Sequence, residues 1–164
     1  MASLAALNGL VDPTSRLDPA AWIDASAVWA ITLWTADRAP LLVGLTGQGL
    51  GLSRLGRLAR QHWEGLDDRF PCIAHRDFAI LPDRMRALVH IPWNHRVRAV
   101  GRIVRWFKAS VERAARKQDL IEAAPIWDAK FEVQLVSSAE ELWLWRRRIN
   151  AGVVGGLAPI HRVG

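Results

Sequence analysis

The chain has 164 residues, of which 51% are hydrophobic, and its formal net charge is +6 at pH 7. This length and composition are typical of one globular domain with its own core and exclude a disordered tail. No apolar stretch approaches the ~20 uncharged residues of a membrane-spanning helix, and the first residues do not read as a signal peptide. Cys72 has no second cysteine to pair with, so we expect a cytoplasmic protein without membrane contact.

Arginine carries the positive charge, since the chain has nineteen arginines and three lysines. Basic domains dominated by arginine often bind phosphate-rich partners. A GC-rich genome would also raise the arginine content, and composition alone leaves both explanations open. The chain also has nine tryptophans and no tyrosine, and the missing tyrosine becomes important below.

The first part of the chain predicts an arm and then a strand. Residues 1–25 are rich in alanine and contain two prolines, which indicates an N-terminal arm. Residues 27–35 (AVWAITLWT) are rich in β-branched and aromatic residues and predict a buried strand. A short second strand is expected at 41–45. The glycine-rich residues 46–52 match no phosphate-binding fingerprint and are interpreted as a loop.

A helix and a hairpin follow. Residues 53–63 predict a helix, because apolar residues and His62, interpreted as a core histidine, recur on one face. Residues 72–81 and 84–91 predict two strands joined by the turn signal Pro82-Asp83. Alternate residues of a strand share a face, so Arg84 and Arg86 should stand side by side. Two such charges near a buried sheet are unfavourable unless an anion lies between them.

A strongly basic helix is predicted at 96–117, with Asn94 as a candidate cap. One side is apolar and much of the rest is cationic, and the cationic residues are Arg98, Arg102, Arg105, Lys108, Arg113 and Arg116. This excess of one sign, with Trp106 among the charges, favours contact with a nucleic-acid backbone over a merely solvated surface.

The remaining elements are a strand, a helix and a tail. Residues 126–136 alternate as a half-exposed strand does. Ser138 and Glu141 form a capping box that begins the last helix, which continues to about Ile149. Residues 159–164 are expected to be a tail, and residues 26–158 a single domain. This order predicts an α+β fold: a central four- to five-stranded, mostly antiparallel sheet, a ferredoxin-like variant, with helices packed on it.

The second half of the chain resembles a known family in the order and spacing of four stretches. These are AILPDRMRALVHIP, IVRWFKASVERAARK, IWDAKFEVQLVSSAEEL and RRRINAGVVGGL. They resemble the REP-associated tyrosine transposases and the related single-strand insertion-sequence transposases, over about residues 72–158. The resemblance implies the transposase-like fold and binding of single-stranded or hairpin DNA. It also implies a metal held by two histidines of the hairpin strand, and a tyrosine nucleophile on the last helix.

The chain departs from this family at each catalytic position. The two histidine positions are Arg84 and Arg86, the tyrosine position is Arg147, and a later polar position is Ala151, or Asn150 after a slip of one residue. Arginine has no lone pair to offer a metal. We therefore expect a DNA-binding protein without catalytic residues, cofactor or metal, in which three guanidiniums hold a phosphate.

Several alternatives stay open. The arginines at the catalytic positions are also explained by drift, and Arg147 by a solvated helix end. The fold could serve as a structural or assembly subunit whose arginines contact acidic protein partners, or could retain weak metal-dependent nuclease activity. A shifted metal site from Asp77, His90 and His95 is a further option. Among the tryptophans, Trp127 and Trp143 are the candidates for exposed stacking platforms.

Overall fold

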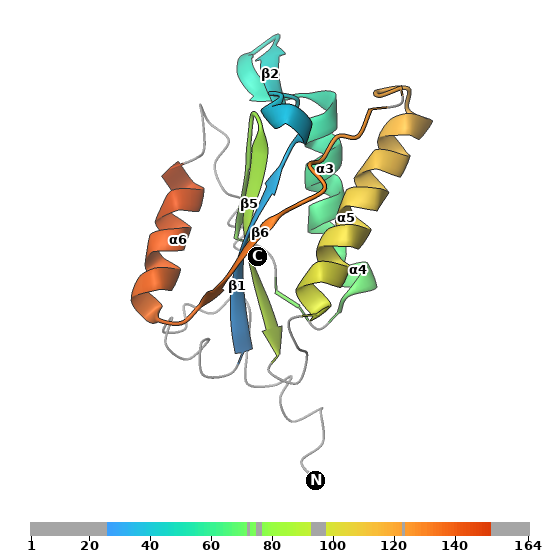
Figure 1. Cartoon of the computed structure of the whole chain (residues 1–164). Helices are drawn as coiled ribbons and strands as arrows, with labels where there is room; N and C mark the ends of the chain where they lie inside the picture. Colours follow the sequence, from blue (N-terminus) through green and yellow to red (C-terminus); the bar gives the residue numbers. More distant parts are fainter. Residues whose placement is uncertain (1–25, 72, 75–76, 93–97, 123, 152–164) are drawn as a thin grey trace.

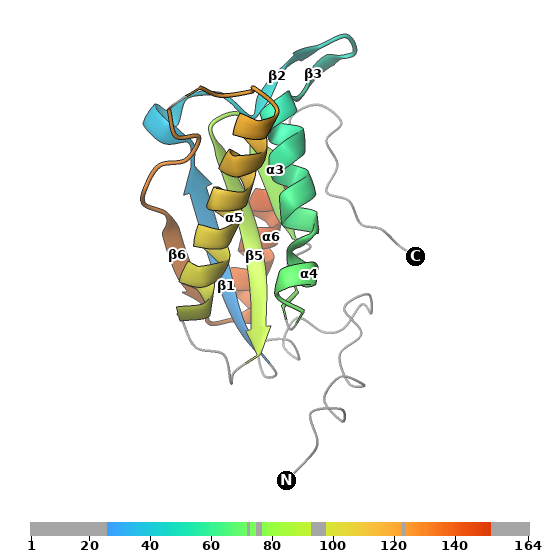
Figure 2. The same ribbon diagram turned by 90° about the vertical axis from the view of Figure 1, so that its right-hand side faces the viewer.

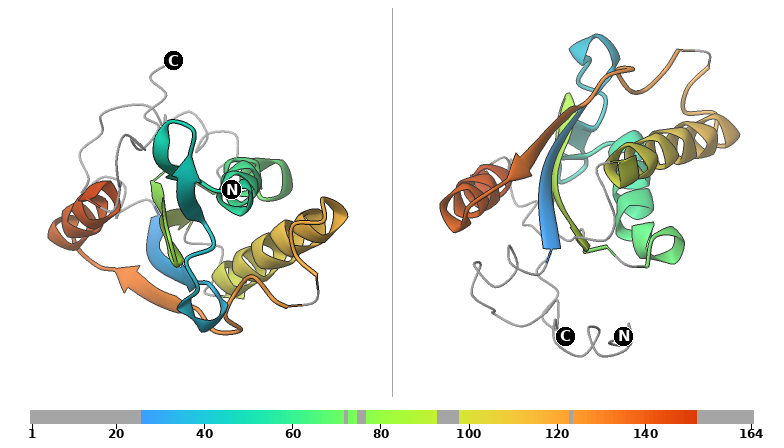
Figure 3. Two further views of the ribbon diagram at one scale, coloured as in Figure 1. Left: turned by 90° about the horizontal axis from the view of Figure 1, so that it is seen from above. Right: turned by 60° about the horizontal axis from the view of Figure 1, so that its bottom comes forward.

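A four-stranded antiparallel sheet lies between a single helix on one face and a layer of helices on the other (Figures 1 and 3). The computed structural model describes residues 26–71, 73–74, 77–92, 98–122 and 124–151. The elements in chain order are β1 (Ser26–Trp34), the 3-10 turn η1 (Ala36–Arg38), β2 (Val43–Thr46), β3 (Gly49–Leu52), α3 (Arg54–Glu64), α4 (Leu66–Arg69), β4 (Phe78–Leu81), β5 (Arg84–Pro92), α5 (Arg98–Lys117), β6 (Glu132–Val136) and α6 (Ala139–Ala151).

The sheet order is β4-β5-β1-β6, and all neighbouring strands are antiparallel. Strand β5 is therefore an inner strand, while β6 forms one edge. In the register of β1 with β5, Trp34 lies opposite Arg84 and Thr32 lies opposite Arg86. Thr32 in turn lies opposite Glu132 of β6. These pairs make two adjacent rows of side chains across the sheet.

Two apolar clusters cover the two faces of the sheet. The larger cluster joins Ile31, Leu33, Met85 and Val89 to α3 and α5, and Figure 2 shows these helices together in front of the sheet. The smaller one joins Val28, Ala30, Ala79 and Leu88 to the buried α6 residues Leu142 and Ile149. Because side chains alternate along β5, Met85 and Val89 face α3 and α5, and Arg84, Arg86 and Leu88 face α6.

Local chemistry explains where two of the helices begin. The Ser53 hydroxyl accepts a hydrogen bond of 3.0 Å from the Gly56 amide, which caps α3. At α6, the Ser138 hydroxyl accepts from the Glu141 amide at 3.1 Å, and the Glu141 carboxylate accepts from the Ser137 amide at 2.8 Å. Gly56 also allows a close approach, because a β-carbon there would lie 2.0 Å from the Leu42 carbonyl oxygen.

The structure confirms the α+β class, the antiparallel sheet and the order of the main elements. Some boundaries differ from those expected. Residues 46–52, interpreted as a loop, contain β3, which pairs with β2 in a ribbon that projects from the body (Figure 1). Strand β4 begins only at Phe78, and β6 only at Glu132. The predicted arm at 1–25, Asn94 and the tail at 159–164 lie outside the described residues. No helix in the described part of the chain is long and apolar enough to cross a membrane.

Candidate nucleic-acid interface

Arg84 and Arg86 stand side by side on the inner strand β5, on the sheet face covered by α6. Their spacing on alternate residues, and the predicted hairpin turn at Pro82-Asp83, are both present. Each side chain is half-buried. The sheet therefore holds two guanidiniums in adjacent rows, as the alternation of the sequence predicts.

Arg86 lies in a field of competing charges. Burial, and then the positive charges of Arg84 and Arg148, lower the pKa of the Arg86 guanidinium, while the carboxylates of Glu132 and Asp83 raise it. The side chain forms no hydrogen bond or salt bridge with any of the described residues. The two arginines and the two carboxylates around it offset one another, so the charge of Arg86 itself is left without a direct partner there. Such a group favours a bound anion.

Arg84 is held more firmly than Arg86. Its Nε donates to Oδ1 of Asp83 at 2.9 Å, and its Nη2 lies 3.4 Å from Oδ2 of the same carboxylate. Its Cζ also lies 4.1 Å from the ring centroid of Trp34, the residue opposite on β1. The Trp34 Nε1 donates to Oε1 of Glu132 at 2.9 Å. Arg84 is thus fixed beside Arg86 by a carboxylate on one side and an indole on the other.

The last helix faces this site, but its three consecutive arginines point in different directions. Arg146 Nε donates to Asp77 Oδ2 at 3.0 Å, which ties α6 to the chain segment before β4. Arg147 is exposed, with its Cζ 5.4 Å from the ring centroid of Trp143 on the same helix. Arg148 is exposed as well, with its Cζ 5.3 Å from the ring centroid of Trp145, and its positive charge is the one of this run that lowers the pKa of Arg86. Of the three arginines, Arg148 is therefore the candidate for the third position beside Arg84 and Arg86.

The positions of the arginines around the axis of α6 explain why Arg147 points away from Arg86. Leu142 and Ile149 define its buried stripe. At about 100° per residue, Arg147 lies roughly 140° around the helix from Leu142, which turns it toward solvent. The same counting places Arg148 nearer the other margin of the buried stripe. The apolar residues Leu142, Trp145 and Ile149 recur at helical spacing in the sequence, so this signal was available before the structure.

The basic helix α5 carries an exposed ridge, but one of its cations is structural. Arg98, Arg102, Arg105, Arg113 and Arg116 are exposed, and at 3.6 residues per turn they fall on one side of the helix. We call these five residues the α5 ridge. Lys108 lies apart: its Nζ donates to the carbonyls of Asp128 at 2.6 Å and Lys130 at 2.9 Å. Burial lowers the Lys108 pKa, against the opposing charges of Asp128 and Glu112.

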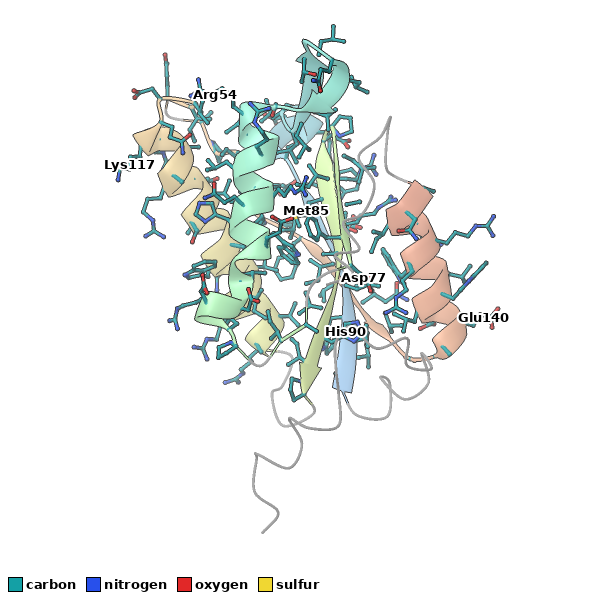
Figure 4. All side chains as sticks on the ribbon, turned by 180° about the vertical axis from the view of Figure 1, so that it is seen from behind. Arg54, Asp77, Met85, His90, Lys117 and Glu140 are labelled. Carbon is teal, nitrogen blue, oxygen red and sulfur yellow. The ribbon has the colours of Figure 1, made fainter. Side chains whose placement is uncertain are left out.

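The α5 ridge and the arginine cluster lie on opposite sides of the sheet. Helix α5 packs on the face of Met85 and Val89, whereas Arg84 and Arg86 face α6. Figure 4 shows the same separation, with Lys117 of α5 and Glu140 of α6 on either side of the sheet. The residues predicted to bind nucleic acid therefore fall into two groups on opposite sides of the sheet.

The structure also bears on the metal site and the exposed tryptophans that the sequence suggested. Among the described residues, no group of three or more His, Cys, Asp or Glu side chains could hold a metal ion, and His95 lies outside them. Asp77, one candidate ligand, instead pairs with Arg146. Trp127 is not an exposed platform, because it is 3% exposed and packs 5.5 Å from Phe107 between ring centroids. Trp143 is 56% exposed, as expected.

Comparison with known proteins supports the fold that this arrangement indicates. No family model matches the chain. The chain is similar to the structure of a REP-associated tyrosine transposase bound to a REP hairpin, with a TM-score of 0.52 and 16% identity over 77% of this chain. It is also similar to a candidate transposase from Deinococcus radiodurans R1, with a TM-score of 0.53 and 11% identity over 79% of this chain and 93% of that one. The protein therefore has a transposase-like fold.

These relatives differ from the chain in length and in sequence. The chain covers 64% of the REP-associated transposase. A curated protein of unassigned function from Haemophilus influenzae (strain ATCC 51907 / DSM 11121 / KW20 / Rd) is 24% identical over 125 residues, which cover 65% of this chain and 68% of that protein. At these identities the comparisons concern the fold, and any binding function has to be argued from the residues of the site.

Proposed function

We propose that the protein is a transposase-like nucleic-acid-binding protein that holds a DNA phosphate at Arg84, Arg86 and Arg148 and does not cut the strand. The observation that carries the proposal is that the half-buried guanidinium of Arg86 stands beside Arg84 and has no hydrogen-bond or salt-bridge partner among the described residues. A phosphate would supply that partner and accept forked, charge-assisted hydrogen bonds. We assign the third position to Arg148 in place of Arg147.

The same residues argue against cleavage. Guanidiniums offer no lone pair to a metal ion, and they occupy both positions where the family resemblance expects histidine ligands. The 164 residues contain no tyrosine, so the expected nucleophile is missing as well. Electrostatic stabilisation of a phosphate without a positioned nucleophile binds the strand and leaves it intact.

A DNA hairpin or single strand is the ligand we favour. One structural neighbour is a transposase bound to a REP hairpin, and the arginine cluster of this chain lies on the strand and beside the helix that the family resemblance assigns to its active site. The competing possibility is a structural subunit whose arginines meet acidic protein surfaces. Phosphate contacts to DNA make affinity fall steeply with salt, and each contact that is lost flattens that dependence.

The test compares arginines of the two basic surfaces. Arg86→Leu and Arg148→Gln should each weaken binding to a hairpin or single-stranded oligonucleotide by about 1–3 kcal/mol, or roughly 5- to 150-fold. The log–log salt slope should fall by ~0.7 per contact on single strands. Arg102→Gln on the α5 ridge is the matched control, since it removes one charge from the opposite face of the sheet. Loss of affinity in Arg102→Gln alone would move the binding site to α5.

Loss of cleavage is tested separately. Incubation with single-stranded hairpin DNA and Mg²⁺ or Mn²⁺ should leave the oligonucleotide intact and give no covalent protein–DNA adduct in denaturing electrophoresis. An adduct would show that a nucleophile other than tyrosine acts in this fold. Cleavage without an adduct, if abolished by EDTA, would instead support the metal-dependent nuclease alternative.

A further inference from the structure

A strained turn places one more arginine beside the cluster. Asp37 and Arg38 follow β1 with φ angles of 53° and 56°, in the left-handed region that residues with a β-carbon disfavour. Buried Thr35 holds the turn, because its hydroxyl oxygen lies within hydrogen-bond distance of two carbonyl oxygens, of Ala39 at 2.7 Å and of Asp83 at 3.0 Å, which share its one hydrogen. Strained backbone that the surrounding structure fixes in this way clusters at functional sites.

The strained turn carries the Arg38 guanidinium onto the indole of Trp34. The Cζ of Arg38 lies 3.4 Å from the ring centroid, which is the contact distance of two stacked planes. Trp34 is itself fixed, because its Nε1 donates to Glu132 and its ring also contacts Arg84. Arg38 is exposed and its side chain makes no hydrogen bond or salt bridge with the described residues. The guanidinium of this exposed residue therefore lies against the ring and is not engaged by a polar group of the described residues.

We propose that Arg38, supported by Trp34, is a stacking platform for an unpaired nucleobase of the strand whose phosphate lies at Arg86; this inference rests on the proposed function. Guanidinium planes stack on bases that are splayed out of a helix, and a fixed plane loses little side-chain freedom when a base binds. Trp34 lies in the row next to that of Arg86, about 7 Å away along the sheet. One nucleotide or two adjacent ones can span that distance.

The Arg38 guanidinium could bind either a base or a second phosphate, and a lysine substitution distinguishes the two. A phosphate would need only the charge of Arg38, so lysine would replace it. A base would need the plane, which lysine lacks. The platform therefore predicts a preference for strands that carry bases, and it predicts that Arg38→Lys removes this preference without changing the number of phosphate contacts.

The experiment measures binding of two probes of equal length and charge: a single-stranded oligonucleotide, and an abasic deoxyribose-phosphate oligomer. The wild type should bind the first more tightly. Arg38→Lys should lower affinity for it by roughly 5- to 100-fold, with affinity for the abasic oligomer and both salt slopes unchanged. Arg105→Lys, the same replacement on the α5 ridge, is the matched control and should behave as the wild type. Trp34→Leu should also remove the preference for bases, because it removes the support of the plane, and it should weaken binding of both probes in addition, because the Trp34 ring also contacts Arg84.

Each result decides between the possibilities. An Arg38→Lys variant that keeps the wild-type preference for bases overturns the platform. Equal losses on both probes would show that the Arg38 plane does not select for bases and would overturn the platform as well. Failure of the proposed function gives a different result: the wild type binds neither probe, or Arg86→Leu leaves binding of the abasic oligomer unchanged. Equal thermal unfolding midpoints for the wild type and Arg38→Lys establish that the comparison concerns binding and not folding.

Discussion

Replacing Lys108 by methionine should destabilise the protein without removing a nucleic-acid contact. The Nζ donates to two backbone carbonyls of the segment before β6, at 2.6 and 2.9 Å. A hydrogen bond from a charged donor contributes about 1.5–3 kcal/mol. The bond to Lys130 is exposed, so water replaces it at small cost, whereas the bond to Asp128 is partly buried. Methionine keeps most of the apolar stem, and we expect a net loss of about 2 kcal/mol.

Urea unfolding of Lys108→Met and of the control Arg105→Met measures this loss. Both variants remove one positive charge from α5, and the exposed Arg105 side chain makes no hydrogen bond with the described residues, so its loss should stay within about 0.5 kcal/mol. The salt slope of DNA binding should be unchanged in Lys108→Met. Equal midpoints for the two variants, or a flatter salt slope in Lys108→Met, would refute the assignment of Lys108 to the fold.

Two further predictions concern stability alone. Burial is the main cause that lowers the pKa of His90 to about 4; the charge of Asp77 opposes this shift and that of Arg146 adds to it. Because the unfolded chain binds this proton at a higher pH than the folded chain does, the free energy of unfolding should fall by about 3 kcal/mol as the pH drops from about 6.5 to below 4. The carboxylates titrate in both the wild type and His90→Leu, so the difference in unfolding free energy between the two proteins across that range reports the protonation of His90 alone. A difference that stays constant with pH would contradict the prediction. Gly56→Ala should destabilise by about 1–3 kcal/mol, since its β-carbon would meet the Leu42 carbonyl at 2.0 Å. Gly101→Ala, which has open space within α5, should stabilise by up to ~1 kcal/mol, and thermal unfolding of both variants would expose an error if their signs agree.

Local pattern was sufficient for the hairpin and the order of elements. The turn Pro82-Asp83 and the alternation after it predicted that Arg84 and Arg86 share a face, because the side-chain period of a strand depends on the strand alone. The buried stripe of α6 followed in the same way from helical spacing. The direction of each arginine of α6 also followed from that spacing, although the family alignment led to Arg147.

Properties set by distant residues could not be predicted from local pattern. Trp127 reads as part of a half-exposed strand, but the Glu112 carboxylate on α5 accepts the Ile126 amide at 3.0 Å and holds this segment against Phe107. The left-handed turn at Asp37 and Arg38 has no glycine to mark it and depends on the Asp83 carbonyl across the sheet. The contact of Trp34 with Arg84 depends on the register of β1 with β5, which neither strand specifies alone.

The division of the positive charge between two sheet faces bears on how a transposase-like fold would bind DNA in this protein. Arg84 and Arg86 are half-buried, lie near the carboxylates of Asp83 and Glu132 and face α6, so they suit a fixed contact with one phosphate. The α5 ridge is exposed and repeats one sign along the helix. Charges of that kind act at a distance and raise the rate of encounter with a polyanion more than the lifetime of the complex. The arginine cluster would thus hold the strand by direct contact, and the α5 ridge would raise the rate at which the strand reaches the protein. A strand held at Arg86 need not touch α5 for the charges of that helix to assist its binding.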